Sequence, residues 1–485
     1  GRRRLPCAAA PPAAPAPLLL DGDWEFELKP TMDNRWGDFR LPVTEKMIGP
    51  EARLFRYLPE TGNAEGWEMP EIDDKHWPEV QAGYGPKFRK LGPLPKMADR
   101  TLLEQKLSAM KTIDPAIPVI IQNQAYSWEP YAFSWRRGIE GDPGDQEGYH
   151  GLKKRVTNDF IRLDPPEGEK NACYYLWTSV KADEKMTVRV HSGPFKPAAL
   201  YLNDKKIDPL SREWVLDAGV HRLLLRYDSP GRGHFVLEKT GFDEPEKGTP
   251  LSMKWWDMPG RMNYDIFPFS ENPAGWVRFN APPGLKAMQI KVMGEIRVWV
   301  DGQPRNVEIL EKGAPSTCRV VLPEPVRRQS TVAVHIRHAK GWYGGSAFPH
   351  PILLDCEKGI TQTGNWSEGS VLDCYSGGAW YRKKIVFSPR QAGSRVMLDL
   401  GTVVATAGVR INGHDAGTLV AAPWKLDISE WVKPGENTLE ILVYNTLANH
   451  YRTVPTRYND TTQPSGLLGP VKMEFSAKTV MKRAY

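Results

Sequence analysis

The chain has 485 residues, with 64 Lys or Arg against 58 Asp or Glu, which gives a formal net charge of +6. Because both signs are scattered along the sequence, no basic stripe is present to follow a phosphate backbone, and nucleic acid is excluded as an expected partner. The length corresponds to about three domains, and the 17 Trp, 17 Tyr, 43 Gly and 43 Pro favour aromatic strands and tight turns over helices.

The N-terminal segment 1–17 combines three arginines with an Ala/Pro run. It lacks an apolar region of the length that a signal peptide needs, so we interpret it as a linker or the edge of a fragment. No stretch of about 20 apolar residues follows, and no membrane-spanning helix is expected. The five cysteines have no metal-binding spacing, which argues against structural zinc, while a Cys356–Cys374 bridge is left open.

A pattern that occurs three times dominates the rest of the sequence. Aromatic strands open the three copies, at 174–177, 275–279 and 379–383. Tight hairpins follow, at Asn203-Asp204, Asp301-Gly302 and Asn412-Gly413. Alternating strands close the copies, at 219–227, 331–337 and 435–444. Type I′ turns need positive φ at both central positions, which favours Asn, Asp and Gly there.

The repeats predict an all-β protein of three tandem antiparallel β-sandwiches of the jelly-roll kind. Polar runs at 241–248 and 357–359 suggest the divisions. We expect a linker at 1–17, sandwiches at 18–245, 246–356 and 357–476, and a tail at 477–485. One short helix is expected over 102–110, because Leu103, Leu107 and Met110 share a helical face; it should lie in a connection and not in a core. In the third sandwich, strand alternation is expected to bury Trp380 in the core.

Carboxylates and signature motifs give no support for catalysis. The acidic stretch 140–147 could offer paired carboxylates or a calcium site, but it lacks the spacing of a calcium loop, and a solvated turn is the favoured interpretation. The sequence contains no phosphate-binding glycine loop, no G-x-S-x-G and no H-E-x-x-H. We therefore assign no catalytic residue, no metal site and no cofactor.

Candidate carbohydrate-binding residues lie near the C-terminus: Trp424, Asn445, Asn449, His450 and Tyr451. The last four follow a closing strand, where loops gather polar side chains at one end of a sandwich. Asn and His donate and accept hydrogen bonds, which suits vicinal hydroxyls, and an indole offers a flat apolar face to a sugar ring. Turn capping or contact with a neighbouring domain is an equally open interpretation of the polar loop.

The remaining aromatic pairs, Trp255-Trp256 and Trp342-Tyr343, could also stack on sugars. Packing in a core or between domains is the favoured interpretation of these rings.

Several segments resemble known families. They are 33–39, 133–151, 375–381, Asn412-Gly413, 422–428, 445–450 and 466–471. The C-terminal ones occur in the order found in the sugar-binding, galactose-binding-like sandwich of family 2 glycoside hydrolases. From about residue 18 to 476 the chain is similar to the region that follows the catalytic barrel in large α-L-rhamnosidase-like proteins of glycoside hydrolase family 106. The resemblance implies two catalytic glutamates on that barrel, and this sequence has no matching positions.

These observations predict a non-catalytic carbohydrate-binding and scaffolding region of a bacterial glycoside hydrolase, secreted or periplasmic, that acts in plant or microbial polysaccharide breakdown. The expected partners are an oligosaccharide or polysaccharide and an upstream catalytic domain of the same polypeptide. Two alternatives stay open: a self-contained glycoside hydrolase with its active site between sandwiches, and a purely structural spacer. Fold alone does not decide among them.

Overall fold

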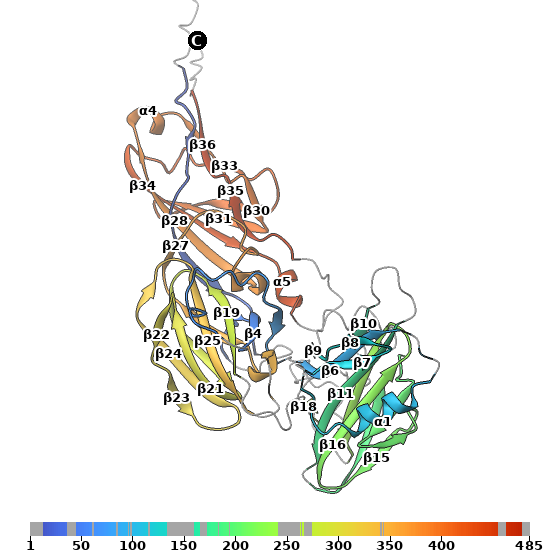
Figure 1. Cartoon of the computed structure of the whole chain (residues 1–485). Coiled ribbons are helices and arrows are strands. Elements are labelled where there is room, and N and C mark those ends of the chain that lie inside the picture. Colours follow the sequence, from blue (N-terminus) through green and yellow to red (C-terminus); the bar gives the residue numbers. More distant parts are fainter. Residues whose placement is uncertain are drawn as a thin grey trace, which may run out of the picture.

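The computed structural model describes residues 13–35, 45–60, 63–83, 86–95, 97, 99–114, 117–132, 160–164, 172–182, 184–193, 195–240, 262, 264–265, 274–339, 342, 344–453 and 462–477. All paired strands in these ranges run antiparallel (Figure 1). The α-helices there are short: α1 (Thr101–Ala109), α4 (Pro389–Ala392) and α5 (Ala448–Tyr451). The predicted all-β sandwich class is therefore confirmed.

Three sheets share one strand order. The first consists of β14 (Lys205–Ile207), β13 (Ala199–Leu202), β16 (Gly219–Tyr227), β11 (Cys173–Ala182), β6 (Pro86–Leu94) and β9 (Glu129–Ala132), with β18 (Tyr264–Asp265) also beside β11. The second consists of β22 (Gln303–Arg305), β21 (Gly294–Val300), β25 (Ser330–His338), β19 (Ala274–Ala281), β4 (Leu54–Pro59) and β5 (Glu79–Gln81). The third consists of β32 (His414–Leu419), β31 (Thr406–Ile411), β34 (Gly435–Tyr444), β28 (Gly377–Phe387), β2 (Trp24–Pro30) and β27 (Gly359–Thr361).

A second sheet packs against each of these. In the first sandwich it consists of β10 (Phe160–Leu163), β17 (Gly231–Lys239), β12 (Met186–Ser192) and β15 (Glu213–Leu216). In the middle sandwich it consists of β23 (Glu308–Glu311), β24 (Ser316–Val326), β20 (Leu285–Val292), β26 (Ile352–Cys356) and β3 (Glu51–Ala52). In the C-terminal sandwich it consists of β1 (Leu18–Leu19), β36 (Lys472–Ser476), β29 (Arg395–Asp399) and β33 (Lys425–Asp427). One apolar core fills each pair of sheets.

The three predicted hairpins occur at equivalent places in the three sheets. The predicted positive φ at both central positions holds at Asp301-Gly302 and Asn412-Gly413 but not at Asp204. Asn203, Asp301 and Asn412 have φ of 58°, 49° and 50° at the turns that join β13 to β14, β21 to β22 and β31 to β32. In each turn the side-chain oxygen of this residue accepts a hydrogen bond from a backbone N–H of the closing strand, at 3.0, 2.8 and 3.0 Å respectively. This contact explains why Asn or Asp occupies the position: both tolerate positive φ and carry a short side-chain acceptor.

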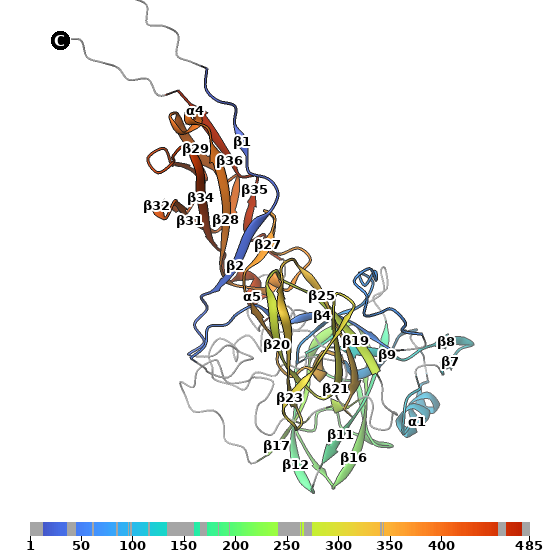
Figure 2. The ribbon, with the colours of Figure 1, turned by 90° about the vertical axis from the view of Figure 1, so that its left-hand side faces the viewer.

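The sandwiches are nested along the chain. Strands β1 and β2 complete the C-terminal sandwich, and β3, β4 and β5 complete the middle one. The first sandwich, from residues 86–265, is inserted between β5 and β19. Figure 2 shows β2 lying among the strands of the C-terminal sandwich, where Phe26 pairs with Tyr381. This pairing differs from the expected division, which placed residues 18–245 in one sandwich, because the apolar faces of β2 and β4 pack into the later cores.

Helix α1 begins one residue before the expected range and lies in the connection between β6 and β7 (Val119–Ile121). Strand β7 pairs with β8 (Gln124–Tyr126). Its Leu107 is buried in a small apolar cluster on the outer face of the first sandwich. The buried Glu104 carboxylate accepts hydrogen bonds from Tyr175 and Tyr201 and pairs with Arg226. Burial raises the pKa of Tyr175 and of Tyr201, which keeps both hydroxyls protonated as donors. This polar network anchors the helix to the sheet.

Cys173, Cys318, Cys356 and Cys374 are free thiols, so the bridge between Cys356 and Cys374 is absent. Burial raises the pKa of Cys356 to about 12, and the pKa of Cys374 is also raised well above its usual value. Thiols with such a raised pKa stay protonated and are poor nucleophiles.

The expectation that Trp380 is buried in the core is wrong. Along β28, Ala379 and Tyr381 face the core, and Trp380 lies half-buried on the opposite face. The guanidinium carbons of Arg382 and Arg410 each lie 5.2 Å from its ring centroid. A shift of one residue along a strand moves a side chain to the other face of the sheet.

Replacing Trp380 with Ala is accordingly expected to lower the free energy of unfolding by about 1–2 kcal/mol, since each partly exposed cation–π contact contributes about 0.5–1 kcal/mol. The adjacent Tyr381, which is 1% exposed, serves as the matched comparison, and Tyr381→Ala should cost about 3–5 kcal/mol. Urea denaturation followed by circular dichroism measures both. Equal losses in the two variants would contradict this assignment of faces.

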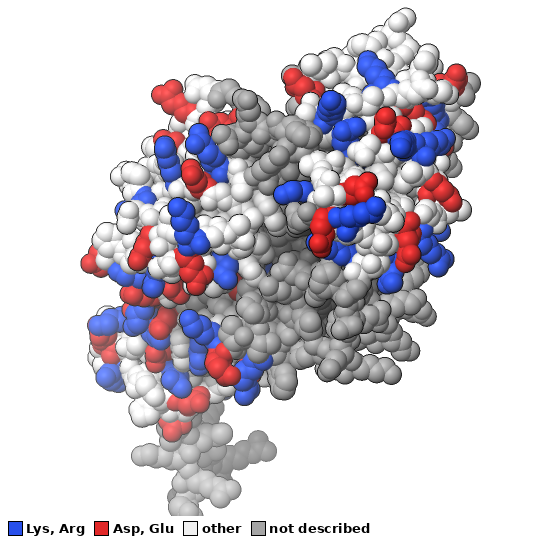
Figure 3. All heavy atoms as spheres, turned by 90° about the horizontal axis from the view of Figure 1, so that it is seen from below, with Lys and Arg blue, Asp and Glu red and all other residues white. Residues whose placement is uncertain are grey.

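Charged side chains of both signs are interspersed on the surface seen from below in Figure 3. In the ranges that the structure describes, no helix is long and apolar enough to cross a membrane.

Candidate functional site

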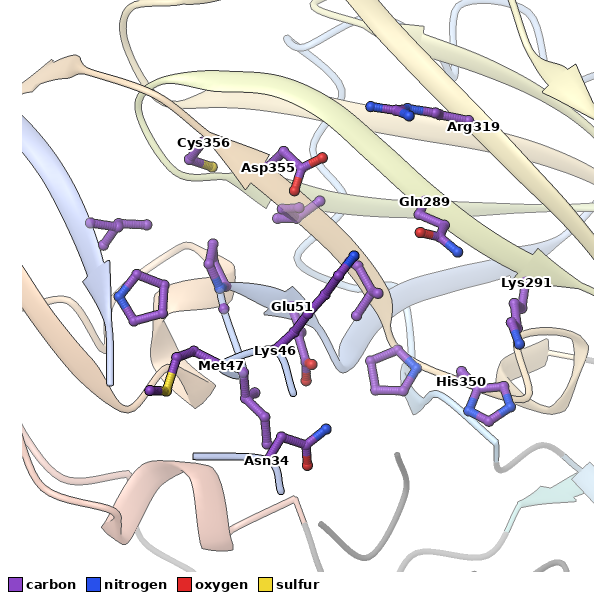
Figure 4. Close-up of a pocket in the computed structure, with 18 of the residues that line it drawn as sticks. Asn34, Lys46, Met47, Glu51, Gln289, Lys291, Arg319, His350, Asp355 and Cys356 are labelled. Atoms are coloured by element: carbon purple, nitrogen blue, oxygen red, sulfur yellow. The ribbon is translucent and has the colours of Figure 1, made fainter. Parts of the chain in front are cut away.

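A cleft of about 780 Å³ lies where the middle and C-terminal sandwiches meet (Figure 4). Its floor is the outer face of β20, β24 and β26 in the middle sandwich. The segment 45–50 before β3 forms the opposite wall, together with the end of β2 and Asn34. The cleft is therefore bounded by parts of both sandwiches.

The floor has its side chains fixed by strand alternation. Met288 and Ile290 point into the core, so Gln289 and Lys291 between and after them point into the cleft. Gln289 lies opposite Arg319 on β24. It also lies opposite Leu353 on β26, which makes one row across three strands, and Asp355 follows further along β26. Figure 4 shows these polar groups on one side of the cleft.

The opposite wall is held by backbone hydrogen bonds. The N–H of Ile48 donates to the carbonyl of Met32 at 2.9 Å, and the N–H of Leu354 donates to the carbonyl of Pro50 at 3.1 Å. Ile48 is buried, while Lys46 and Met47 on the same segment are exposed. In Figure 4 the Lys46 side chain extends from this wall toward the strands of the floor.

A buried ion pair of the middle sandwich lies beside the cleft, and its arginine also contacts the C-terminal sandwich. Glu51, which lines the cleft, is 4% exposed, and its Oε2 lies 2.8 Å from Nε of Arg53, which is 1% exposed. Nη1 of Arg53 also donates to Oγ1 of Thr453 at 3.5 Å. Nε2 of Gln81 donates to the carbonyl of Thr453 at 2.6 Å. Because Thr453 lies two residues after α5 of the C-terminal sandwich, these contacts join the middle and C-terminal sandwiches beside the cleft.

The charge on the floor is available to a ligand. Lys291 and Arg319 form no ion pair with any other residue in the described ranges. Their ammonium and guanidinium groups are donors only, whereas the Asp355 and Glu45 carboxylates are acceptors when ionised. A cleft with donors and acceptors on separate rigid elements suits a polyhydroxylated molecule. No group of three or more His, Cys, Asp or Glu that could hold a metal occurs in the described residues.

Two of the sequence-predicted sugar ligands are engaged within the protein. Asn445 accepts from the N–H of Gly377 at 2.9 Å and donates to the carbonyl of Tyr375 at 2.8 Å. Asn449 is 3% exposed; its amide nitrogen donates to Ser367 and to the carbonyl of Gln463, and its oxygen accepts from the N–H of Gln463. These contacts close loops, which matches the turn-capping interpretation.

His450 and Tyr451 belong to α5. His450 is 2% exposed, and its carbonyl accepts from both the N–H and the hydroxyl of Thr453. The side chain of Tyr451 lies outside the described part of the chain. The α5 loop thus approaches the middle sandwich, in agreement with the interpretation as contact with a neighbouring unit.

Trp424 occupies a different place. Its half-buried ring packs on the C-terminal core, and its carbonyl accepts from the N–H of Leu400. Leu400 precedes β30 (Thr402–Val404), which pairs with β35 (Gly466–Gly469), so Trp424 lies near the Thr402 end of this pair of strands. Asn449 lies near the other end, because it donates to Ser367, and Ser367 contacts Ser465, which directly precedes β35. Sugar binding by the five predicted residues stays a prediction, but these contacts do not gather them into one site.

Other candidates fall outside the described residues: the acidic stretch 140–147, Trp255, Trp256 and Tyr343. Trp342 is described and half-buried, with its N–H donating to the carbonyl of Ala339.

Sequence reasoning missed the cleft residues. The outward polar side chains of 286–292 and 317–321 alternate with apolar ones, which is a signal for an exposed sheet face. Nothing in the sequence shows that this face meets another sandwich.

No protein-family model matches the chain. Over 106 residues it is 35% identical to a protein described as a putative beta-glucuronidase, from Formosa agariphila. The match covers 21% of this chain and 9% of that protein, so the chain spans less than a tenth of the relative's length. The similarity relates about a fifth of the chain to a glycosidase.

Solved structures give weak superpositions. A rhamnosidase from Novosphingobium sp. PP1Y matches 68% of this chain and 26% of its own, with 18% identity and a TM-score of 0.22. The Streptomyces avermitilis alpha-L-rhamnosidase complexed with L-rhamnose matches 66% and 44%, with 11% identity and a TM-score of 0.14. An anti-sigma factor domain-containing protein from Clostridium clariflavum matches 42% and 85%, with 10% identity and a TM-score of 0.13. At these values the superpositions carry no argument about function.

Proposed function

We propose that this chain is a carbohydrate-binding and scaffolding region of a glycoside hydrolase, and that the cleft between the middle and C-terminal sandwiches binds part of the saccharide. The observation that carries the proposal is the cleft of about 780 Å³ with Gln289, Lys291 and Arg319 on its floor. Small-molecule sites typically enclose about 300–1,000 Å³ and place a few polar groups on rigid elements.

The chemistry of the lining supports a saccharide. A sugar presents hydroxyls that both donate and accept, and the cleft offers cationic donors together with the carboxylates of Asp355 on the floor and Glu45 on the opposite wall. Arg319 and Lys291 also suit a sugar that carries a carboxylate or sulfate, because charge-assisted hydrogen bonds are the stronger ones. The buried contacts of Arg53 and Gln81 with Thr453 hold the walls in place, which is the scaffolding part of the proposal.

The catalytic part of the proposal lies with another domain. The sequence similarity to a putative beta-glucuronidase supports a place within a glycosidase. A polysaccharide substrate implies action outside the cytoplasm, either secreted or periplasmic. The upstream catalytic domain of the same polypeptide is the partner that this role requires.

Substitutions of the two cationic residues on the cleft floor test this function. Arg319→Ala and Lys291→Ala are each expected to weaken saccharide binding by about 10-fold, the equivalent of about 1.4 kcal/mol, which is close to the lower end of the range for a hydrogen bond to a charged group. Isothermal titration calorimetry with oligosaccharides that contain rhamnose or glucuronic acid measures the change.

Arg395→Ala is the matched control, because Arg395 is an exposed arginine paired with Asp427 in the C-terminal sandwich and does not line the cleft. It should leave affinity unchanged. Wild-type affinity in both floor variants would contradict binding in the cleft, and an absence of binding to all the oligosaccharides would favour the structural spacer.

A self-contained hydrolase remains the second candidate, because the carboxylates of Glu45 and Asp355 line the same cleft. If this candidate is right, the chain alone hydrolyses an aryl glucuronide or aryl rhamnoside, and the Asp355→Asn variant loses that activity. Hydrolysis by the chain alone that is lost in Asp355→Asn would contradict the non-catalytic role.

A further inference from the structure

Four tryptophans gather on the outer face of the sheet that contains β19, β21 and β25, on the side of the middle sandwich away from the cleft floor. Trp77 and Trp276 are 2% and 6% exposed, while Trp67 and Trp299 are half-buried. Ring centroids lie 5.0 Å apart for Trp67 and Trp77, 6.4 Å for Trp67 and Trp276, and 5.1 Å for Trp276 and Trp299.

Packing accounts for three of these rings. Arg278 is 1% exposed; its Nε donates to Asp74 at 2.8 Å, and Nη1 donates to the carbonyl of Trp67. Its guanidinium carbon lies 5.9 Å from the ring centroid of Trp77. These contacts hold the segment around residues 67–77 onto the sheet, and Trp67, Trp77 and Trp276 form a small core beneath it.

Trp299 stands at the edge of this core. Val298 and Val300 face the main core, so the Trp299 side chain points outward from β21. It packs beside Trp276 with an interplanar angle of 35°. Part of the ring stays at the surface, whereas Trp276 is almost fully covered. A partly exposed indole supported from beneath by another ring is a rigid apolar platform.

Polar groups border the platform. Oε2 of Glu60 accepts from Nε1 of Trp276 at 3.1 Å and lies 2.8 Å from Nε2 of His335. The side chains of Glu60 and His335 are 33% and 22% exposed. The exposed Arg297 lies opposite His335 in the strand register and two residues before Trp299, so it is on the same face. A carboxylate, an imidazole and a guanidinium are thus held next to one indole.

We propose that this surface is a second carbohydrate site, at which a pyranose ring stacks on Trp299 while Glu60, His335 and Arg297 bind its hydroxyls. An indole matches the apolar C–H face of a pyranose whose hydroxyls are equatorial. The carboxylate accepts from vicinal hydroxyls, and the guanidinium donates to them. This inference rests on the proposed carbohydrate-binding function and adds a site that the cleft does not include.

Two sites on opposite faces of one sandwich have a consequence for polysaccharide binding. A single polymer that reaches both sites can occupy them together, and the second binding event then benefits from a raised effective concentration. The cleft alone has no such advantage.

The test uses the full chain with cellotetraose and β-1,4-galactotetraose as probes, followed by calorimetry and tryptophan fluorescence. Trp299→Ala is expected to weaken binding of at least one probe by 10-fold or more, and Trp299→Phe is expected to retain part of the affinity. Trp380→Ala is the matched control, since Trp380 is a half-buried tryptophan beside two arginines on an outer sheet face of another sandwich. Its affinity should equal that of the wild type, and thermal unfolding should show that each variant is folded.

The outcomes separate the two proposals. A loss in Trp299→Ala with wild-type binding in Arg319→Ala supports the second site. If Arg319→Ala loses affinity for the oligosaccharides that contain rhamnose or glucuronic acid, the cleft proposal stands. If Trp299→Ala at the same time binds cellotetraose and galactotetraose like the wild type, the proposal of a second site is overturned. An absence of binding to both tetrasaccharides, or an equal loss in Trp380→Ala, also overturns it.

Discussion

Replacing Glu51 with Ala is expected to lower the free energy of unfolding by about 3–5 kcal/mol, the usual cost of removing one partner of a buried ion pair. The guanidinium of Arg53 is 1% exposed and lies 2.8 Å from Glu51, so solvent cannot replace the lost carboxylate. Arg53 also contacts Thr453 of the C-terminal sandwich, so the loss should loosen the junction between sandwiches. Guanidinium chloride unfolding followed by tryptophan fluorescence measures the change.

An exposed ion pair gives the matched control. Lys384 and Glu436 lie 2.9 Å apart with side chains 71% and 57% exposed, and Lys384→Ala should cost less than about 1 kcal/mol. The double variant Glu51→Leu with Arg53→Met should regain much of the stability, since apolar residues of similar volume often replace a buried pair without loss. A cost below about 1 kcal/mol for Glu51→Ala would show that the pair is hydrated, in contradiction to its burial.

Replacing Trp24 with Ala is expected to destabilise the C-terminal sandwich by about 3–5 kcal/mol, although the rest of that sandwich lies at the other end of the sequence. Trp24 is 1% exposed, and its ring makes an edge contact with Tyr381 at a centroid distance of 6.3 Å. Limited proteolysis with mass spectrometry measures the effect. Cleavage within residues 359–453 should accelerate, while cleavage within 195–240 should stay at the wild-type rate.

A second comparison tests the nesting directly. The isolated region 357–476 lacks β1 and β2, so it should show no cooperative unfolding transition. The same region joined to residues 13–30 should unfold cooperatively. In the full chain, Leu102→Ala serves as the neutral control for Trp24→Ala, because Leu102 is 81% exposed on α1 of the first sandwich. Full stability of the isolated 357–476 region would contradict the role of the early strands.

Features that depend on nearby residues could be predicted from the sequence. The hairpins at Asn203, Asp301 and Asn412 depend on local φ and on one side-chain acceptor, and the pattern indicated all three. The partnership of Phe26 with Tyr381 could not be predicted, because many alternating strands offer equivalent apolar faces to a distant partner.

The candidate sites show the same limit. Polarity and loop position pointed to Asn445 and Asn449, but the hydrogen bonds of both are used within the chain. Arg319 and Lys291 looked like ordinary outward residues of a strand, and only the packing of two sandwiches makes them the floor of a cleft. For Trp380, the sequence located the strand correctly but assigned the side chain to the wrong face of the sheet, because a shift of one residue along a strand exchanges the two faces.

The pairing of Leu18 with Met473 has a consequence for synthesis of the protein on the ribosome. Roughly 450 residues must be translated before β1 meets its partner, which takes on the order of 20–90 s at elongation rates of about 5–20 residues per second. The apolar face of the adjacent β2, with Trp24 and Phe26, lacks its native neighbours until β28 has emerged. The first sandwich can fold in the meantime, so the nascent chain carries a folded domain while β2 is still unpaired.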